Sequence, residues 1–442
     1  MDTIKEKIFL SYDIRGLYPK EINADVSWRL GYYLPSLLIK EGFLPKRKLK
    51  IVVGRDVRKN GFILLNNLIQ GLIQNNVEVM DAGIITTPLL YFLIKNYQFD
   101  LGIIITGSHL NENYTGFKIY TNELKAITGE QLKKYLTQFN QPVTIGLIKG
   151  KQSRKNFSGE YANFLLKQSG IKKYLANLQN KNILVCCPKT TQLILEKIKK
   201  ELKIKMQFVH RPIPKRLLNK RKNDFMVQFD ADGDRLYVVQ KNGEEVLGDV
   251  LGAFFIELLK DEKPKKVILD CRCSCFLEDL AKKYNFEVIY SKAGHSFFKE
   301  AMKKNQALLG IEKSGHYYWR DFFYADSGVF SFLMFLKFLA KENQPLPDLI
   351  KKFVGQKIIG PEINFKLKSE TQALRIIQKI ESQFAKMGEI SKIDGLTVKS
   401  KNFHFNLRPS NTEPSILRLN LEASDQKTYQ DILSRLTKII KH

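Results

Sequence analysis

The chain has 442 residues, of which 44% are hydrophobic and 26% charged, so it is neither a small binding module nor a disordered chain. Its 72 Lys and Arg against 45 Asp and Glu give a net charge of +27, which fits nucleic acid or an anionic substrate and decides for neither. No apolar run reaches the roughly 18 residues of a membrane span, and the N-terminus lacks a signal-peptide core, so we expect a cytoplasmic protein without a membrane partner.

The five cysteines form two local clusters. Cys186 and Cys187 are adjacent, whereas Cys271, Cys273 and Cys275 alternate along ILDCRCSCFL. An odd number at such spacing is not a disulfide framework and fits a reducing cytoplasm. The alternation predicts a strand, and it lacks the paired spacing that structural zinc sites prefer.

Residues 1–145 are predicted to form an α/β domain. The runs KLKIVVGRD, GFILLNNLIQGLIQNN, VEVMDAG and LGIIITGS predict strand, helix, strand and strand. The last strand carries Ser108 and His109 into a polar loop. A serine at a strand end is exposed and approachable, although alone it also fits a turn or a helix cap. No GxSxG elbow is present, so an esterase triad is not supported.

Residues 146–243 are predicted to contain a metal site. The strand NILVCC has its partner in MVQF, which leads into the loop FDADGDR. Asp230, Asp232 and Asp234 stand two apart in that loop, and hard divalent cations take such oxygen ligands. A turn with solvated acids is the alternative. An EF-hand is excluded because Lys241 occupies the position of the bidentate Glu and the flanks are strands, so we favour magnesium over calcium.

Residues 244–355 and 356–442 each carry a polar loop. In GIEKSGHYYWRD, alternate positions hold side chains suited to sugar hydroxyls, namely Glu312, Ser314 and His316, although an ordinary exposed strand has the same alternation. In LRPSNTEPS, four side chains offer donors without an intervening acid: Arg408, Ser410, Asn411 and Thr412. Such a set suits a phosphate dianion.

These four motifs, in this order, resemble the α-D-phosphohexomutase superfamily, and TGSH with YTGFKI most resembles its bacterial phosphomannomutase/phosphoglucomutase branch. The resemblance covers essentially the whole chain and includes YDIRG, GRDVR, the D-x-[KR]-C-[ST] pattern and SKAGHSFFKE. It implies an α/β fold of four domains, in which three similar mixed α/β sheet domains precede a smaller C-terminal α+β domain. We place these domains at 1–145, 146–243, 244–355 and 356–442.

The resemblance implies an isomerase that moves phosphate between the C1 and C6 oxygens of mannose or glucose phosphate through a 1,6-bisphosphate. Ser108 would be the phosphoserine and would share Mg²⁺ with Asp230, Asp232 and Asp234, and hexose 1,6-bisphosphate would be an activator. For the proton transfer the resemblance points to four side chains without choosing among them: Lys118, His109, Arg15 and His316. For the substrate it points to Arg235, Arg272, His295, Glu312, Ser314, Arg408, Ser410, Asn411 and Thr412.

Two loops depart from the usual pattern of this family. Leu110 and Asn111 follow His109 where Asn-Pro is usual, and Lys313 follows Glu312. A phosphoglucosamine mutase is the nearest alternative, and a degenerate basic nucleic-acid-binding protein is the alternative from another class. Because all three aspartates are present, we expect an enzyme with a hexose phosphate substrate and no nucleic-acid partner, as a monomer or a weak dimer.

Overall fold

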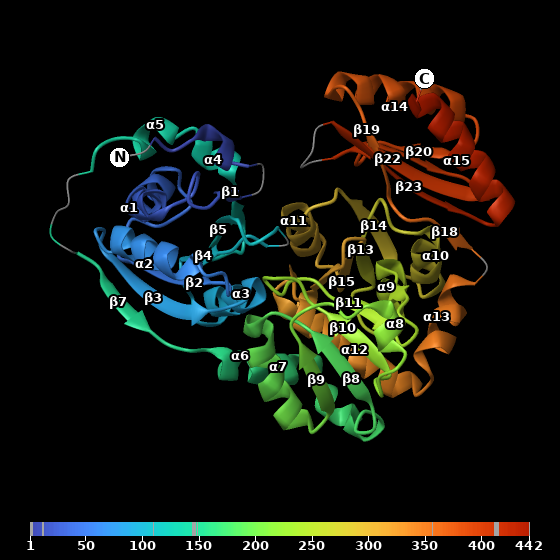
Figure 1. Ribbon diagram of the computed structural model, residues 1–442, viewed down its shortest axis with the longest axis horizontal. Helices are drawn as coiled ribbons and strands as arrows, with labels where there is room; N and C mark the ends of the chain where they lie inside the picture. Colours follow the sequence, from blue (N-terminus) through green and yellow to red (C-terminus); the bar gives the residue numbers. More distant parts are fainter. Residues whose placement is uncertain are drawn as a thin grey trace. The chain divides into compact units, whose positions relative to one another are not determined.

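The computed structural model describes residues 3–10, 13–108, 110–143, 147, 149–355, 357–410 and 415–441. They form two compact units, one of Met1–Glu245 with Asp321–Lys341 and the other of Val246–Arg320 with Glu342–His442. Four sheets follow one another along the chain, as the colours of Figure 1 show. Within the described ranges, no helix is both long and apolar enough to cross a bilayer.

The first sheet has the order β1-β5-β4-β2-β3-β7, with β6 added to β5. Its strands are β1 (Ile14–Leu17), β2 (Leu49–Arg55), β3 (Val77–Ile84), β4 (Leu101–Ile105), β5 (Tyr114–Thr121), β6 (Ala126–Ile127) and β7 (Lys151–Arg154). Its helices are α1 (Ala24–Lys40), α2 (Gly61–Leu72), α3 (Thr87–Asn96), α4 (Gly129–Lys133) and α5 (Leu136–Phe139), after the short η1 (Glu6–Ile8). Because β2 runs parallel to β4, the loops that follow both strands lie at one edge of the sheet.

The predicted strands and helix of this region are confirmed as β2, α2, β3 and β4, and the elements that the structure adds include α3, between β3 and β4. The sequence TPLLYFLIKN of α3 is buried at eight of its ten positions. It therefore lacks the polar face whose helical period would have revealed it. Helices α1 and α2 cross so closely that a Cβ on Gly71 would lie 2.1 Å from the carbonyl oxygen of Trp28.

The second sheet, also in the first unit, has the order β12-β11-β10-β8-β9. Its strands are β8 (Asn182–Cys186), β9 (Lys205–Val209), β10 (Phe225–Gln228), β11 (Tyr237–Gln240) and β12 (Glu245–Val246). The helices of this region are α6 (Ser158–Ser169), η2 (Ile171–Asn177), α7 (Lys189–Leu202) and α8 (Lys215–Leu218). A later segment of the chain also packs in this region and contains η3 (Arg320–Phe322), β17 (Ala325–Asp326) and α12 (Gly328–Glu342). The ring centroids of Phe335, on α12, and Phe225, on β10, are 5.4 Å apart.

Four strands of the third sheet lie in the second unit, in the order β14-β13-β15-β16. They are β13 (Lys266–Asp270), β14 (Glu287–Ser291), β15 (Leu309–Glu312) and β16 (His316–Trp319), with helices α9 (Gly248–Leu258), α10 (Cys275–Lys283), α11 (His295–Asn305) and α13 (Leu346–Val354). The strand predicted through the three alternating cysteines is wrong. Strand β13 ends at Asp270, whose side chain accepts a hydrogen bond from the backbone N–H of Arg272 at 3.0 Å and turns the chain into α10.

The last sheet has the order β18-β23-β22-β21-β20, with β19 on β23, and its pairs are antiparallel. Its strands are β18 (Ile358–Ile359), β19 (Ile363–Lys366), β20 (Glu389–Ser391), β21 (Leu396–Lys399), β22 (Phe403–Pro409) and β23 (Ile416–Ala423), covered by α14 (Glu370–Phe384) and α15 (Gln426–Lys441). Three mixed α/β sheets and an antiparallel C-terminal sheet covered by two helices confirm the predicted fold class.

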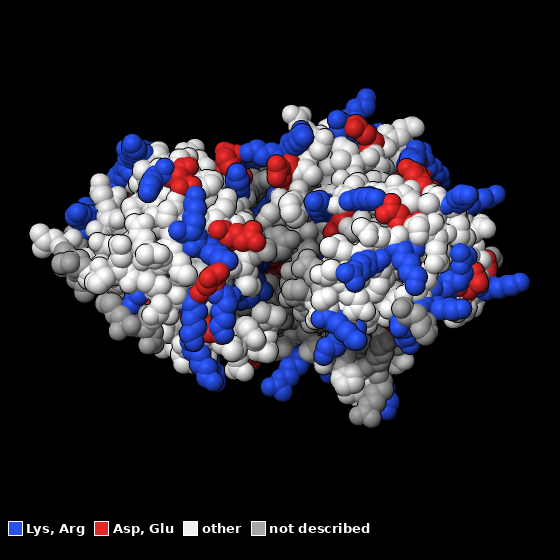
Figure 2. Space-filling view, turned by 90° about the horizontal axis from the view of Figure 1, so that it is seen from above, with Lys and Arg blue, Asp and Glu red and all other residues white. Residues whose placement is uncertain are grey.

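The positive charge is dispersed on the face shown in Figure 2, where Lys and Arg side chains lie scattered with Asp and Glu among them. Many of the lysines are paired: Lys48 lies 2.8 Å from Glu78, and Lys172 lies 3.1 Å from Glu201. Opposite charges are therefore interspersed on this face, as is typical of a solvated surface.

Candidate functional site

Ser108 follows β4 and lies in a tightly held turn. Its backbone φ is 50°, in the left-handed region, and its N–H donates to the Thr106 hydroxyl at 2.8 Å. The Ser108 hydroxyl donates to Oδ1 of Asp232 at 3.2 Å. The residue is only 4% exposed, so the expectation of an exposed serine is wrong: the loop that carries the aspartates covers it.

Arg58 holds the backbone around Ser108. One guanidinium nitrogen donates to the carbonyls of Ser108 and Leu110 at 2.8 and 2.7 Å, and the other donates to those of Asn111 and Tyr114 at 2.5 and 3.0 Å. Its Nε donates to Asp56 at 3.0 Å. A planar fork with several donors suits this task, because it fixes direction as well as distance.

Asp56 connects the Arg58 fork to the end of β4. Its carboxylate accepts hydrogen bonds from the Thr106 hydroxyl at 2.8 Å and from the backbone N–H of Arg58 at 3.0 Å. Burial raises the pKa of Asp56, although these donors act in the opposite direction. A Cβ on Gly107 would lie 2.5 Å from the guanidinium carbon of Arg58, so the Arg58 fork requires glycine there.

The loop between β10 and β11 brings Asp230, Asp232 and Asp234 together. One carboxylate oxygen from each lies within 4.8 Å of the others. Asp232 is fixed from α3, because the Thr87 hydroxyl donates to its carboxylate at 2.8 Å and the Thr87 N–H donates to its carbonyl at 2.9 Å. Gly233 has a φ of +73°, which glycine adopts at no steric cost.

The three carboxylates fit a divalent cation. Burial, together with repulsion from Asp234 and Asp232, raises the pKa of Asp230 well above its usual value. Oδ2 of Asp230 is buried and accepts no hydrogen bond from any residue that the structure describes. A hard cation bound to these oxygens would offset the repulsion among the carboxylates and would give Oδ2 of Asp230 a partner. The donor set therefore fits the predicted Mg²⁺.

Two basic side chains flank the carboxylates. Lys118 of β5 is buried, and its Nζ lies 2.5 Å from Asp232 and 3.2 Å from Asp234. Burial by itself would lower the pKa of Lys118, but the two carboxylates outweigh it and raise that pKa. Nε of Arg235 lies 3.6 Å from Asp230, and its Nη1 donates to the Tyr237 hydroxyl at 3.4 Å. Positive charge therefore adjoins the aspartate cluster.

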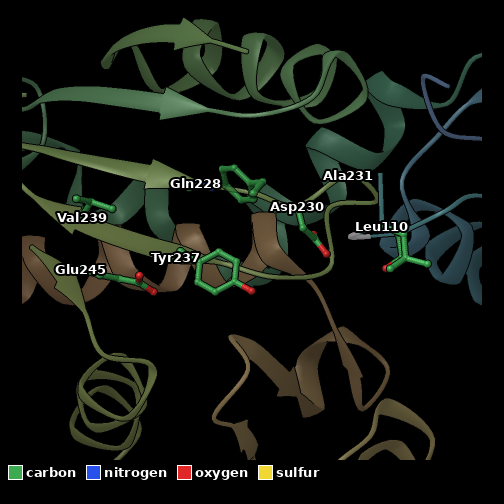
Figure 3. A pocket seen from close by; sticks show the side chains of 9 residues that line it. Leu110, Gln228, Asp230, Ala231, Tyr237, Val239 and Glu245 are labelled. Atoms are coloured by element: carbon green, nitrogen blue, oxygen red, sulfur yellow. The ribbon is translucent and has the colours of Figure 1, made fainter. Parts of the chain in front are cut away.

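A cavity of about 450 Å³ opens beside this group. Ser108 and Leu110 line it from the first sheet, and Asp230, Tyr237 and Glu245 line it from the second. Figure 3 shows the polar ends of Asp230 and Tyr237 in the same opening as Leu110. The volume matches that of a small-molecule site.

In the second unit, Glu312 and its neighbours form a polar group at the turn from β15 to β16. Glu312 pairs with His316 across the strands, accepts a hydrogen bond from the Tyr318 hydroxyl at 2.9 Å and lies 3.5 Å from Arg272. The Ser314 hydroxyl lies 2.9 Å from Nδ1 of His316. The structure therefore brings four of the predicted residues of this unit together.

Arg408, at the end of β22, is a buried guanidinium without full pairing. It is 4% exposed, and its Nε lies 3.9 Å from Asp394, beyond hydrogen-bond distance. Its Nε and Nη1 donate to no residue in the described part of the chain. Ser410 follows it and is also buried. Buried, unsatisfied donors at a loop are what a phosphate site requires.

Two of the remaining predicted residues have local partners. Arg15 of β1 pairs with Asp13, and His295, the first residue of α11, lies 3.4 Å from the Ser296 hydroxyl. His109, Asn411 and Thr412 lie outside the described residues. Lys313, which departs from the family pattern, donates to the Arg272 carbonyl at 3.3 Å and so contacts protein groups of its own unit.

The sequence reasoning missed the residues that hold the site rather than those that form it. Thr87, which fixes Asp232, is the first residue of the helix that was not predicted. Asp56 and Arg58 were noted as part of GRDVR, but without a role. The sequence signal for Asp56 and Arg58 is that charged residues directly follow a predicted strand, because loops at strand ends often position functional groups.

Comparison with known proteins covers nearly the whole chain. Family models match at residues 6–142 (Phosphoglucomutase/phosphomannomutase, alpha/beta/alpha domain I), 247–356 (domain III) and 362–439 (C-terminal domain). A phosphomannomutase of Methanocaldococcus jannaschii is 33% identical, with 98% of this chain and 97% of that protein covered. A phosphoglucomutase of Neisseria gonorrhoeae is 29% identical, with 100% and 98% covered. The crystal structure of a phosphoglucomutase/phosphomannomutase family protein from Burkholderia thailandensis has a TM-score of 0.83 at 26% identity, with 99% and 98% covered.

Proposed function

Because the chain belongs to the phosphoglucomutase/phosphomannomutase family, we propose that it is an isomerase that interconverts hexose 1-phosphate and hexose 6-phosphate. The observation that carries the proposal is the buried Ser108 hydroxyl, which donates to Asp232 at 3.2 Å beside two further carboxylates and Lys118. Phosphoryl transfer needs alignment and charge neutralisation more than covalent chemistry, and this group supplies both.

Ser108 would store the phosphoryl group between two transfers. In the first, the bond from phosphorus to the serine oxygen breaks, a bond to the free sugar hydroxyl forms, and the hydroxyl proton leaves to a base. The hexose 1,6-bisphosphate then returns its other phosphate to the serine. Lys118, His109, Arg15 and His316 remain the candidates for the proton transfer. Arg235 would hold the phosphoryl oxygens.

Asp230, Asp232 and Asp234 would hold Mg²⁺ together with an oxygen of the phosphoserine, and the bound cation supplies charge neutralisation for the transferred group. In its protonated form, Lys118 would add a second positive charge beside these carboxylates. Arg58 would keep the serine in line by fixing the carbonyls around it.

The second unit would recognise the substrate. Glu312 and Ser314 would accept and donate hydrogen bonds to sugar hydroxyls, with Arg272 and His295 as further contacts. Arg408 and Ser410, with Asn411 and Thr412, would bind the phosphate that is not reacting. The buried Arg408 nitrogens without partners in the described ranges support this assignment. We propose mannose or glucose as the sugar and hexose 1,6-bisphosphate as the activator.

A coupled assay tests the proposed function. Mannose 1-phosphate, glucose 1-phosphate and glucosamine 1-phosphate are compared at equal concentration with Mg²⁺ and glucose 1,6-bisphosphate. We expect turnover of the first two and less of the third, since the relatives reported above are phosphomannomutases and phosphoglucomutases. Turnover of none of the three would contradict the proposal, and a clear preference for the amino sugar would favour the alternative, phosphoglucosamine mutase.

Replacing Arg58 should slow the transfer without removing the phosphoserine. In Arg58→Lys a single ammonium cannot span the four carbonyls, so the serine loses alignment and kcat should fall by roughly 10²-fold, with KM little changed. Steady-state kinetics and intact mass measure the two effects. The exposed neighbour Lys59→Ala is the control and should match the unaltered protein. An equal loss in Lys59→Ala, or a change in KM alone, would remove the positioning role.

Replacing Arg408 should weaken productive substrate binding. Arg408→Ala removes a fork that makes charge-assisted bonds to phosphate, so kcat/KM should fall by roughly 30-fold to 1,000-fold. The bisphosphate should also escape more often before the second transfer. Arg418→Ala is the matched control, because Arg418 is the cross-strand neighbour and is held by Glu362 at 3.1 Å. A normal KM with no added bisphosphate release in Arg408→Ala would place the phosphate site elsewhere.

Three further features remain proposals. We retain domains at 1–145, 146–243, 244–355 and 356–442, which limited proteolysis can test. We retain a monomer or weak dimer. The cytoplasm remains the proposed compartment because all five cysteines are free thiols.

A further inference from the structure

Three residues far apart in the sequence converge in the second unit, away from the residues assigned to the reaction. Cys275 is the first residue of α10, whereas His404 and Glu422 lie on β22 and β23. His404 and Glu422 are direct cross-strand partners, so their side chains share one face of the sheet. The backbone N–H of Cys275 donates to Oε1 of Glu422 at 2.8 Å, which brings the start of α10 to the pair.

The side chains of these three residues offer a set of metal ligands. One ligand atom from each, the thiol sulfur, an imidazole nitrogen and a carboxylate oxygen, lies within 4.8 Å of the others. Nδ1 of His404 lies 3.6 Å from Oε1 of Glu422. His404 and Glu422 are 8% and 6% exposed. A separate cavity of about 150 Å³ is lined by all three residues, and this is room for an ion with a bound water.

We propose that Cys275, His404 and Glu422 bind Zn²⁺ as a structural site, with water from the cavity as the fourth ligand. Thiolate, imidazole and carboxylate are the ligands that zinc takes in proteins, whereas Mg²⁺ and Ca²⁺ take oxygen. On binding, the thiol proton of Cys275 passes to solvent as the zinc–sulfur bond forms. The thiolate and the carboxylate then balance the charge of the ion.

The surroundings permit a cation in spite of three nearby lysines. Lys399 is the cross-strand partner of His404, and its charge is offset by an ion pair with Glu278. Lys357 and Lys401 line the same cavity. Lys357 lies 3.4 Å from Asp279, which offsets its charge, and Lys401 is exposed to solvent. Cys271 and Cys273, the neighbours of Cys275 in sequence, are not part of the group. The site therefore joins α10 to the open end of the β22–β23 hairpin, whose other end carries Arg408 and Ser410.

Zinc and cobalt binding to the full chain test the proposal. Co²⁺ in the site should produce the near-ultraviolet charge-transfer absorption of a cobalt–thiolate bond at one equivalent, and Zn²⁺ should displace it and raise the unfolding temperature. Cys275→Ser should abolish the absorption, and His404→Ala should weaken Zn²⁺ binding by at least about tenfold. Cys271→Ser is the matched control and should keep both signals. Asp230→Asn should also keep the absorption, because the aspartate cluster contains no sulfur.

A measurement on the unaltered protein covers the case in which a variant does not fold. Zn²⁺ should protect Cys275 from alkylation, as read by peptide mass, with removal of zinc by a chelator restoring the reaction. Absence of the cobalt–thiolate absorption, its persistence in Cys275→Ser, or equal alkylation of Cys275 with and without Zn²⁺ would each overturn the proposal.

Discussion

Ser108→Ala should lower kcat by at least about 10³-fold while the protein remains folded. Among the described side chains of this turn, Ser108 is the hydroxyl that contacts the aspartate cluster, since it donates to Asp232 at 3.2 Å whereas the Thr106 hydroxyl donates to Asp56. Alanine loses the oxygen that stores the phosphoryl group, and the two half-reactions lose their shared intermediate. The coupled assay measures the loss, and intact mass should show that the phosphorylated species is absent.

Two further variants separate chemistry from folding in this test. Ser108 has a φ of 50°, where glycine is unstrained, so Ser108→Gly should be as inactive as Ser108→Ala and at least as stable. Ser153→Ala, at an exposed position on β7, should retain full activity. Residual turnover above a few per cent in both Ser108 variants would refute the phosphoserine assignment.

Removal of the divalent cation should cost about 10³-fold in kcat, because charge neutralisation by a metal ion contributes several kcal/mol to transition-state stability. EDTA should abolish turnover and Mg²⁺ should restore it. In Asp230→Asn, Mg²⁺ should restore little of the turnover. Without metal, however, this variant should be at least as stable as the parent, because the carboxylate that it removes is buried beside Asp232 and Asp234 and has its pKa raised by them.

Thermal unfolding with and without Mg²⁺ distinguishes this account from simple destabilisation. The parent should gain stability with Mg²⁺, and Asp230→Asn should lose that gain without becoming less stable in EDTA. Glu245→Gln is the control, since Glu245 lines the same cavity but is not part of the aspartate cluster. An equal Mg²⁺ response in Asp230→Asn and Glu245→Gln would mean that the cation binds elsewhere.

The sequence by itself determined the fold class, the family and the chemistry of its loops. Strand and helix periods predicted three of the seven strands of the first sheet, β2, β3 and β4, and FDADGDR identified three oxygen ligands at a strand end. These features are local, because side-chain period and residue type are set by the chain's immediate neighbours. The same reasoning failed for α3, which is apolar on nearly all sides, and for the cysteines, where Asp270 turns the chain into α10.

Only the tertiary structure decided how the loops are held and which residues meet. Arg58 holds carbonyls some 50 residues away, Thr87 fixes Asp232, and Cys275 meets His404 and Glu422. None of these contacts has a local sequence period, since each depends on which strand ends share an edge or which strands pair. Burial of Ser108 has the same origin, because the aspartate loop that covers it belongs to another sheet. The sequence names the chemical groups, and long-range packing sets their distances and charges.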